Sequence, residues 1–436
     1  MRRTLLNRRR WPASNLAVRP FSRIGQFQVT AQHDPRVFRT RGSCCLKDRA
    51  DSVTTKGVGI EAQSLPLSAV SSVPSSALTL LGLETSCDET AAAVMRGENL
   101  LSSVLYSQHD VHRRYGGVVP ELAARRHIET VEAVVTEAMT QAKIEWSDLH
   151  AVAVTSGPGL AGALLVGVSV GKAIAYAGGI PLMGVNHLEG HIASAWMECP
   201  DLPRPCMVLV VSGGHTHLYL TTSVGVYQLI GHTLDDAAGE AFDKAAKMLG
   251  LGFPGGPALD RLAQSGNPAA IAFPRPYLNN KNLDFSFSGI KTALLYYLRD
   301  MDRSGNQRPL ADIAAGYQEA IVEVLVEKAF AAVKRYKAHA LAVVGGVSAN
   351  SRLRALLANR AVKIGIPLAI PRGVFCTDNA AMIAAAGRQA YLAGCWASWE
   401  LEADPEWSLQ TVNPSGAMSG SRERSRNASL HTARRK

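Results

Sequence analysis

Two histidines spaced four residues apart are the first feature of this sequence that could do chemistry. His187 and His191 fall in a stretch with helical periodicity, so both rings lie on one helix face and can bind one metal ion. Zinc peptidases space their histidines in the same way but place a glutamate directly after the first one. Here Glu189 stands two positions on and is expected to point away from that face, which disfavours a peptidase. The alternative is a pair of structural histidines.

A metal site needs a third ligand that is distant in the sequence, and Asp378 is the best candidate. It stands in the segment CTDNAAMIAAA, immediately before a helix of small residues. Two imidazoles and one carboxylate would leave coordination positions open for a substrate oxygen, as a Lewis-acid site requires. The alternative role for Asp378 is that of a helix N-cap, which is common for aspartate at such a place.

Two glycine-rich turns could bring bare backbone close to a bound anion or nucleotide. The first, at residues 210–214, joins a buried strand to two glycines. The second follows the strand that ends at Val344 and spans residues 345–350, where the Asn350 side chain offers a hydrogen-bonding partner. Either turn alone could be an ordinary connection between elements.

Clustered carboxylates stand beside another glycine pair at residues 235–257. Asp243 could accept ribose hydroxyl groups, whereas most of the other acids there fit a solvated helix face. Residues 167–173 do not form a P-loop, because three residues separate their glycines and Ala173 replaces the Ser or Thr that would bind magnesium. Small residues for close helix packing explain that segment better.

The periodicity of apolar residues predicts an α/β protein with two related halves. Residues 77–94 and 207–221 each fit a strand, a polar turn and a second strand. Helices are expected at 120–143, after Pro158, and at 187–197, 243–249, 258–264, 288–298, 313–335, 351–359 and 379–392, and further strands at 151–155, 181–185 and 340–344. A duplicated hairpin suggests two lobes that face a cleft. Three prolines at residues 200–205 predict the boundary between the lobes.

The positive charge of the chain is confined to its two ends. Of the 46 Lys and Arg residues, 1–77 hold 13 against 4 acidic residues, and 414–436 hold 6 against 1. The body between them has 27 basic and 31 acidic residues, so any RNA contact there must come from a local patch.

The Arg- and Ser-rich N-terminal segment, whose first acidic residue is Asp34, is typical of a transit peptide. Residues 1–77 are therefore expected to be a disordered presequence for the mitochondrion or, as second choice, the plastid, and 414–436 a disordered basic tail. A disordered basic arm without a targeting role is the alternative.

Residues 151–185 are apolar but contain Pro158, Pro181 and Lys172, so a strand, a turn and a buried helix are expected there and no membrane insertion. The seven cysteines include no CxxC pair, which indicates neither a disulfide framework nor a zinc ribbon.

Ten sequence blocks in one order point to a known family. They are LGLETSCDET, GGVVPELAARRH, GPGLAGALLVG, NHLEGH, VSGGHTHL, DDAAGEAFDK, FPGGP, DFSFSGIKTA, GGVSAN and CTDNAAM. Together they resemble the signature set of the tRNA N6-adenosine threonylcarbamoyltransferase family, specifically its mitochondrial branch, over roughly residues 83–392. The resemblance implies the two-lobed, duplicated α/β fold of the sugar kinase, Hsp70 and actin superfamily with a nucleotide cleft. Residues 78–203 would form the first lobe with the metal-binding helix, and 204–413 the second lobe with the nucleotide motifs.

By the same resemblance, each motif implies a role for named residues. One divalent cation, zinc or iron, would be bound by His187, His191 and Asp378. The residues that would bind the substrate are Val210, Val211, Ser212, Gly213, Gly214, Asp243, Gly256, Asp260 and Asn350. Of these, Asp260 has a counterpart in only some relatives. Asp88 and Glu89 match acidic positions that face the cleft and are the candidates for a catalytic base.

The implied reaction transfers threonylcarbamoyl from threonylcarbamoyl-AMP to N6 of the adenosine next to the anticodon (position 37), releasing AMP. Its substrates would be mitochondrial tRNAs that read codons starting with adenine. A separate synthase would make the donor, and the enzyme would act as a homodimer. Two other classes stay open: an ATP-dependent kinase of the same fold, which would tolerate loss of the histidines, and a non-catalytic nucleotide-binding scaffold or chaperone.

Overall fold

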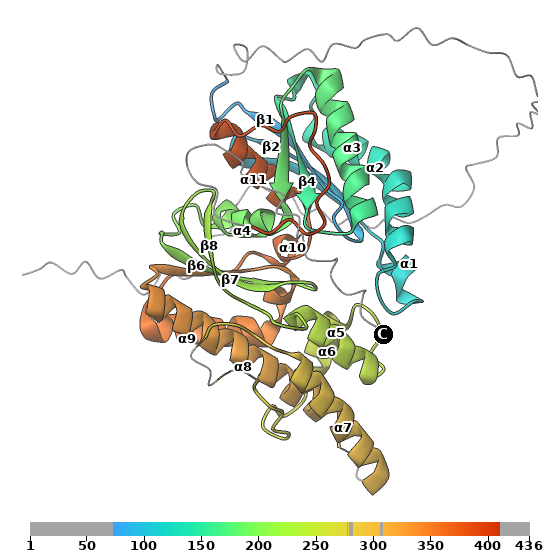
Figure 1. The fold of residues 1–436 in the computed structure, drawn as a ribbon, viewed down its shortest axis with the longest axis vertical. Coiled ribbons are helices and arrows are strands. Elements are labelled where there is room, and N and C mark those ends of the chain that lie inside the picture. The colour runs from blue at the N-terminus through green and yellow to red at the C-terminus, as the bar shows by residue number, and fades with distance from the viewer. Residues whose placement is uncertain (1–72, 277, 279–281, 306–307, 410–436) are drawn as a thin grey trace, which may run out of the picture. The chain divides into compact units, whose positions relative to one another are not determined.

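The computed structural model describes residues 73–276, 278, 282–305 and 308–409 (Figure 1). The basic tail at 414–436 and nearly all of the expected presequence at 1–77 therefore lie outside the described residues, and the predictions made for them remain predictions.

Two five-stranded sheets with the same strand arrangement form the framework of the described residues. The first sheet consists of β1 (Thr79–Glu84), β2 (Glu89–Arg96), β3 (Asn99–Ser107), β4 (Ala151–Gly157) and β5 (Leu182–Asn186) in the order β3-β2-β1-β4-β5. The second consists of β6 (Cys206–Val211), β7 (Thr216–Ser223), β8 (Val226–His232), β9 (Ala340–Val344) and β10 (Leu368–Ala369) in the order β10-β9-β6-β7-β8. In each sheet the central strand pairs antiparallel with the next strand along the chain and parallel with a later one. The predicted duplication is confirmed.

The inner strands β1, β4, β6 and β9 form because runs of apolar residues make up most of their length. Every residue of β1, β4, β6 and β9 is buried. Continuous apolar runs of this kind suit strands that have helices on both faces. The sheets are therefore layered between helices, and their ends carry the polar turns.

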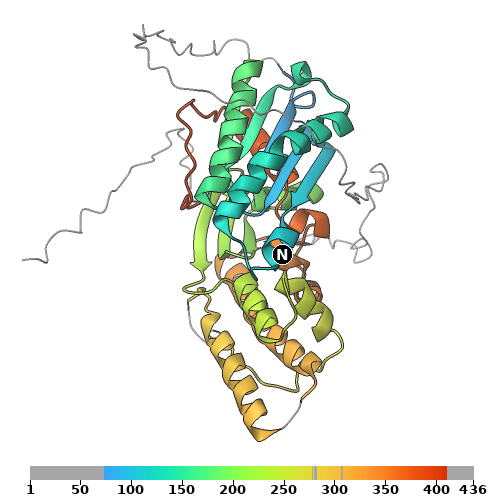
Figure 2. The same cartoon turned by 90° about the vertical axis from the view of Figure 1, so that its right-hand side faces the viewer.

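Helices α2 (Pro120–Ala142) and α3 (Ala161–Gly178) cover one face of the first sheet (Figure 2). The small residues of α3 allow a close approach, because a Cβ at Gly167 would lie 2.3 Å from Oγ1 of Thr85 and one at Gly171 would lie 3.2 Å from Val154. This confirms that residues 167–173 serve helix packing.

The expectation that α3 is a buried helix is wrong for its outer face. Leu165 is 59% exposed and Tyr176 is 69% exposed, although other residues of the helix pack on the sheet. Within the described ranges α3 alone is long and apolar enough to cross a membrane, by length and composition only. That is weak evidence, because a helix that packs on a sheet can pass the same test.

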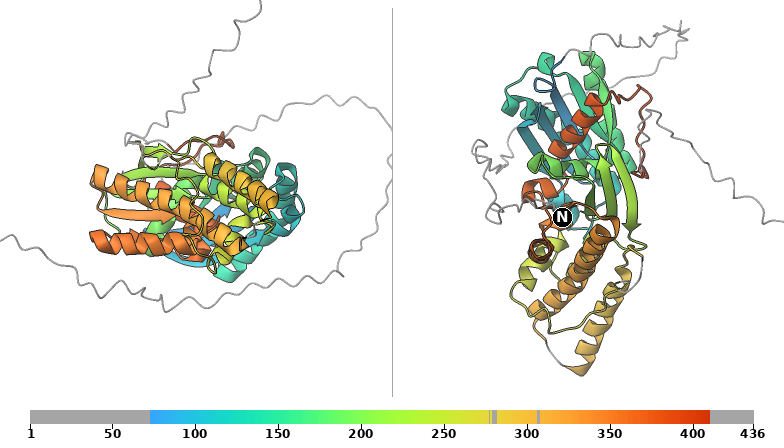
Figure 3. Two further views of the ribbon diagram at one scale, coloured as in Figure 1. Left: turned by 90° about the horizontal axis from the view of Figure 1, so that it is seen from below. Right: turned by 90° about the vertical axis from the view of Figure 1, so that its left-hand side faces the viewer.

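The opposite face of the first sheet is covered by α11 (Ala380–Leu392), as Figure 3 shows. This helix falls in the range expected for the second lobe, so the lobes are not consecutive in the chain as the ranges 78–203 and 204–413 suppose. The physical reason is its close fit to the first sheet: a Cβ at Gly82 would lie 2.5 Å from the Ala380 carbonyl oxygen, and one at Gly387 would lie 2.2 Å from Ala153.

Five helices pack on one face of the second sheet around a large apolar core. They are α5 (Ala238–Met248), α6 (Gly255–Ala263), α7 (Ser288–Ser304), α8 (Leu310–Tyr336) and α9 (Ser351–Ile364). On the other face lies α4 (His187–Glu198), which contacts the second sheet through Leu188 and Ile192. Its Ala193 belongs to the core that includes β5 and α11, so α4 lies between the two lobes.

The expected elements are present, with differences at their ends. Helix α6 begins at Gly255, earlier than expected, because Oδ1 of Asp243 accepts hydrogen bonds from the Gly255 and Gly256 amides of its first turn. Strands β3 and β8 are not among the predicted elements. Both are partly exposed and carry polar residues, which weakens the apolar signal of a strand.

Candidate functional site

The first turn of α4 carries the two histidines. The side chain of Asn186 caps this helix by accepting a hydrogen bond from the Leu188 amide at 2.9 Å, so His187 is the first helical residue. Both rings are buried, and their centroids are 4.7 Å apart. The expected helix and the shared face of His187 and His191 are therefore confirmed.

Glu189 lies elsewhere, as expected from its position in the sequence. Its Oε1 accepts a hydrogen bond from the Tyr227 hydroxyl of β8 at 3.1 Å. It is thus bonded to the second sheet and is not placed as the general base of a peptidase.

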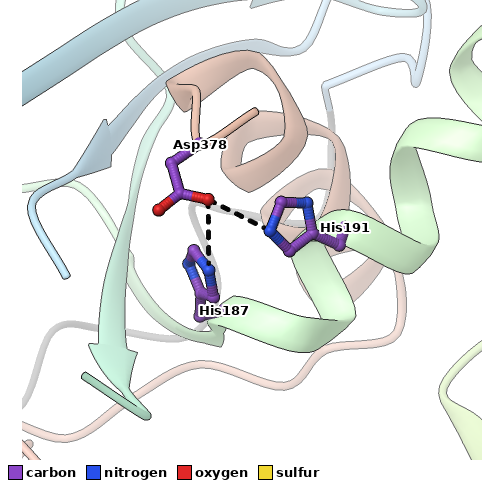
Figure 4. Close-up of side chains that lie close together, drawn as sticks. All are labelled: His187, His191 and Asp378. Atoms are coloured by element: carbon purple, nitrogen blue, oxygen red, sulfur yellow. Dashed lines mark hydrogen bonds and ion pairs between the residues drawn. The ribbon is translucent and has the colours of Figure 1, made fainter. Parts of the chain in front are cut away.

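Asp378 meets both histidines (Figure 4). Its Oδ1 lies 3.4 Å from Nε2 of His187 and 3.1 Å from Nε2 of His191. One atom from each of the three side chains falls within 4.8 Å of the other two. Residues separated by almost two hundred positions in the sequence therefore converge on one point.

The alternative role of Asp378 as a helix cap is excluded by its neighbour. The N-cap of α11 is Asn379, whose Oδ1 accepts the Met382 amide at 3.0 Å. The Asp378 carboxylate is thereby left to face α4. Gly190 allows the two helices to meet, because a Cβ there would lie 2.7 Å from Cδ1 of Ile383.

A fourth side chain, Glu84 at the end of β1, contacts the ring nitrogen of His187 that faces away from Asp378. Its Oε2 lies 3.0 Å from Nδ1 of His187 and also accepts the Thr155 hydroxyl at 2.7 Å. The carboxylate is fully buried. A carboxylate on the far nitrogen of a histidine fixes the tautomer and the ring orientation of a metal ligand.

The electrostatics at this point favour positive charge. Burial disfavours the charged form of His187, yet the carboxylates of Asp378 and Glu84 outweigh burial and raise its pKa well above the ordinary value. Burial lowers the pKa of His191. Two imidazole nitrogens and a carboxylate oxygen with a second carboxylate behind them suit zinc or iron, so the donor set fits a divalent cation.

His187 and Asp378 lie at the edge of a cleft between the two lobes, whereas His191 is fully buried and does not line it. The cleft has a volume of about 1030 Å³ and is lined by residues of both lobes. Of the residues predicted as sites, those that line it are Asp88, Glu89, His187, Ser212, Gly213, Gly214, Asp243 and Asp378. The structure thus brings two of the three candidate ligands, the acid pair and the glycine turn to one cavity.

The turn after β6 presents backbone to this cleft. The Ser212 amide donates to the His215 carbonyl at 2.8 Å, whereas the amides of Gly213 and Gly214 donate to no acceptor within the described ranges. Gly239, in the first turn of α5, would place a Cβ 2.5 Å from the Ser212 carbonyl oxygen. The absence of a side chain there lets the positive end of α5 lie against the turn, an arrangement that suits an anion.

Asp88 and Glu89 stand at the start of β2 together with a histidine from α1 (His109–Arg113). His109 Nε2 lies 3.3 Å from Oε1 of Glu89 and 3.9 Å from Oδ2 of Asp88. Burial raises the pKa of Glu89 to about 8 despite the hydrogen bond from His109. The Glu89 bond raises the pKa of His109. A carboxyl group with such a pKa can accept or release a proton near neutral pH.

Other predicted substrate-binding residues are engaged in contacts within the second lobe. Val210 and Val211 are fully buried in β6. Asn350 caps α9 through the Leu353 amide and donates to Gln318 at 2.7 Å. These three residues do not line the cleft.

Asp260 accepts hydrogen bonds from the amide and the hydroxyl of Ser351. The Gly256 amide donates a hydrogen bond to Oδ1 of Asp243. Asp243 lines the cleft, whereas Gly256 does not.

Sequence reasoning missed Glu84 and His109. It also missed Lys244 and Lys247 of α5, which line the cleft. Glu84 carries a signal in retrospect, since a charged residue at the end of a wholly apolar strand needs a buried partner. His109 carries none, because its partners become neighbours only through the pairing of β2 with β3.

Comparisons with known proteins agree with this arrangement. The family model described as tRNA N6-adenosine threonylcarbamoyltransferase matches residues 99–385. A protein of that name from Anaeromyxobacter dehalogenans (strain 2CP-C) is 55% identical over 332 residues, which cover 76% of this chain and 99% of the relative. The protein of that name from Syntrophotalea carbinolica is 52% identical over 334 residues, which cover 76% and 97%.

A solved structure shares the fold. The crystal structure of T. kodakarensis HypF is 13% identical and covers 73% of this chain and 48% of that one, with a TM-score of 0.50. With the duplicated sheets, this likeness confirms the predicted two-lobed α/β fold. Because relatives of one name share about half of its residues over three quarters of its length, the chain belongs to the tRNA N6-adenosine threonylcarbamoyltransferase family.

Proposed function

We propose that this chain transfers the threonylcarbamoyl group of threonylcarbamoyl-AMP to N6 of the adenosine at position 37 of mitochondrial tRNAs that read codons starting with adenine. The observation that carries the proposal is the single cleft in which His187, Asp378 and the Ser212–Gly214 turn meet, with His191 within reach of the same point. Family membership supports the reaction, and the relatives named above carry its name. A kinase of the same fold would have no use for the converging histidines.

The bond changes of this reaction balance without a redox partner. A bond forms between N6 of adenosine and the carbamoyl carbon, the bond from that carbon to a phosphate oxygen of AMP breaks, and N6 loses one proton. The phosphate oxygen keeps the electron pair, so negative charge grows on AMP as it leaves. The donor is already activated, and the enzyme's task is orientation and charge stabilisation.

Chain residues are available for each of these tasks. The free amides of Gly213 and Gly214, with the N-terminus of α5 behind them, would bind the phosphate and stabilise its growing charge. Glu89, with its raised pKa and its bond to His109, would accept the N6 proton, and Asp88 would assist it.

A divalent cation, zinc or iron, would be held by His187, His191 and Asp378. When bound, it would supply Lewis acidity toward donor oxygens. Glu84 would orient His187 for that role.

The setting of the reaction is also part of the proposal. The arginine-rich composition of residues 1–77 supports import into the mitochondrion, with the plastid as alternative. A separate synthase would supply the donor.

A homodimer is supported by the exposed apolar residues Leu165 and Tyr176 of α3 and Ile128 of α2. Light scattering of the purified protein would test the dimer, and import of a full-length fusion against one that lacks residues 1–77 would test the compartment.

The transfer assay uses the purified protein, threonylcarbamoyl-AMP and unmodified tRNA with adenosine at position 37. The modified nucleoside is measured by mass spectrometry after digestion, and AMP is measured in parallel. We expect both products in equal amounts, none with tRNA that carries guanosine at that position, and strong loss with His187→Ala. The matched control is His339→Ala, since His339 is exposed and outside the cleft. Sugar-dependent ATP hydrolysis without nucleoside modification would replace this proposal with a kinase.

A further inference from the structure

The loop between α1 and α2 contributes residues to the cleft and to a second, smaller hollow. Gly116 and Gly117 of this loop and Arg113 at the end of α1 line the cleft. Arg114 and Tyr115 of the loop line a hollow of about 290 Å³ together with Arg125 and Arg126 of α2. Cationic side chains therefore stand next to the cleft, on the loop and near the start of α2.

Three cations in or next to the cleft have no acidic partner among the described residues. Arg126 pairs with Glu129 at 2.6 Å, and Arg113 pairs with Asp110 at 3.2 Å. In contrast, Arg114, Arg125 and Lys247 are exposed and form no ion pair with a described residue. We call these three residues the basic rim. Their positive charge is notable because the body of the chain has more acidic than basic residues.

Lys247 brings the second lobe into the rim. It lies on α5 and lines the cleft, and its Nζ would be 3.5 Å from a Cβ built on Gly116 of the first lobe. Its ammonium group therefore stands across from the loop that carries Arg114. The rim thus has members on both sides of the opening.

An aromatic side chain stands next to the rim. Tyr115 is 55% exposed and lines the same hollow as Arg114 and Arg125. Exposed aromatic rings between cationic side chains are the combination that binds single-stranded nucleic acid, because bases stack on the ring while phosphates meet the cations.

We infer that the basic rim binds phosphates of an RNA strand on either side of the nucleotide whose base enters the cleft, while Tyr115 stacks on a flanking base. This inference rests on the proposed function, since it assigns the surface that presents the tRNA loop to the donor. The charge pattern of the sequence required a local patch for RNA, and the basic rim is such a patch next to the cleft. An acidic protein could also bind the cations of the basic rim, but it has no nucleobase that could enter the cleft.

The test measures tRNA binding as a function of salt, with the full protein and unmodified tRNA. In the double variant Arg114→Ala/Arg125→Ala, two phosphate contacts are lost, so the slope of log K against log salt should decrease in magnitude by about 1.4. Binding at 0.1 M salt should weaken roughly 25-fold. This value assumes that wild type and variant bind equally at 1 M salt, so that a slope difference of about 1.4 acts over one tenfold step in salt concentration. Lys247→Ala should lower the slope by about half as much. Tyr115→Phe should bind like the wild type, and Tyr115→Ala should bind more weakly.

Matched controls are Lys334→Ala and Lys363→Ala, which remove exposed cations of the second lobe outside the cleft. They should leave the slope unchanged. Calorimetry with threonylcarbamoyl-AMP should give the wild-type affinity for Arg114→Ala/Arg125→Ala, because neither residue lines the cleft. An unchanged slope in this variant, or loss of binding to an acidic peptide with tRNA binding intact, would overturn the inference. If wild-type protein binds tRNA through the rim but makes no modified nucleoside, the rim stands and the proposed function fails.

Discussion

Glu84 and His187 form a buried carboxylate–imidazole contact of 3.0 Å behind the candidate metal site. The contact joins the end of β1 to the first residue of α4, so it connects the first sheet to the helix between the lobes. It leaves Nε2 of His187 directed toward Asp378. The histidine is thereby positioned for a cation by a residue that does not itself face the cation.

Replacing Glu84 with glutamine should weaken metal binding. The amide keeps the shape of the side chain but no longer carries the charge that makes His187 a stronger ligand, and loss of such a partner costs roughly 10- to 100-fold in affinity. Competition between the protein and a chelator for zinc, followed by absorbance, measures the change. Glu198→Gln is a suitable control, because Glu198 ends the same helix and pairs with Arg372 outside the site. Equal zinc affinity in Glu84→Gln and wild type would remove Glu84 from the site.

Gly190→Ala should disturb the meeting of α4 with α11. The added Cβ would lie 2.7 Å from Ile383 and 3.2 Å from Met382, in a part of the core with no free space. Such overpacking costs about 1–3 kcal/mol, and it would also displace Asp378, which precedes α11. Urea unfolding and zinc affinity should both be affected.

The control for this substitution is Gly289→Ala in α7, where the nearest atom, Cγ of Pro276, is at an ordinary 3.5 Å. That variant should be equal to wild type or slightly more stable, since alanine suits a helix better than glycine. A Gly190→Ala protein as stable as wild type would show that α11 is free to shift.

The convergence of the candidate metal ligands could be predicted from sequence because their signals are local. The spacing of His187 and His191 needs only one helix, and Asp378 stands at the start of another. His109 could not be found in this way, because its importance depends on which strands pair. The charge of Glu84 at the end of an apolar strand indicates a buried partner, but which residue is that partner depends on how α4 meets the first sheet. The predicted range of the second lobe wrongly includes α11 for the same reason. A helix of small apolar residues could pack on either sheet, and the close approach of α11 to Gly82 places it on the first sheet.

Asn350 illustrates a different limit of sequence reasoning. A Gly-Gly turn followed by asparagine fits a nucleotide contact and a helix cap equally well. In the structure its oxygen accepts the Leu353 amide and its amide group donates to Gln318, so both of its polar atoms have partners. The turn itself still approaches the end of β6, since Gly345 has a φ of +92° and its Cβ would lie 2.4 Å from the Val211 carbonyl oxygen.

Asn350→Ala should therefore lower stability by about 1–2 kcal/mol, through loss of the cap and of a buried bond. Asn350→Asp keeps the capping oxygen and should retain part of that stability. Thermal unfolding of the protein without nucleotide measures both effects. If neither variant changes the melting temperature, the two hydrogen bonds of Asn350 do not contribute to the stability of the fold.

The stability of the protein should depend on pH through Glu89. Burial raises the pKa of this carboxyl group to about 8, whereas in the unfolded chain it is close to the ordinary glutamate value of 4.5. A raised pKa in the folded state contributes stability that is present below about 4.5 and is lost as the pH rises through about 8. His109, whose pKa is also raised, acts in the same direction. Urea midpoints between pH 5 and pH 9 should therefore fall more steeply in wild type than in Glu89→Gln, and parallel curves would contradict the raised pKa.

His187→Ala should reduce stability as well as activity, because it removes the partner of a fully buried carboxylate. Glu84 would then keep the Thr155 hydroxyl and the Ser86 amide, yet it would lose the imidazole at 3.0 Å. An uncompensated buried charge costs several kcal/mol, so the melting temperature should drop. Adding Glu84→Gln to His187→Ala removes the charge and should restore most of the lost stability without restoring transfer. Recovery of stability with continued inactivity would separate the structural role of the pair from its role in the site. If the double variant melts at the temperature of His187→Ala, the Glu84 charge is not what destabilises the single variant.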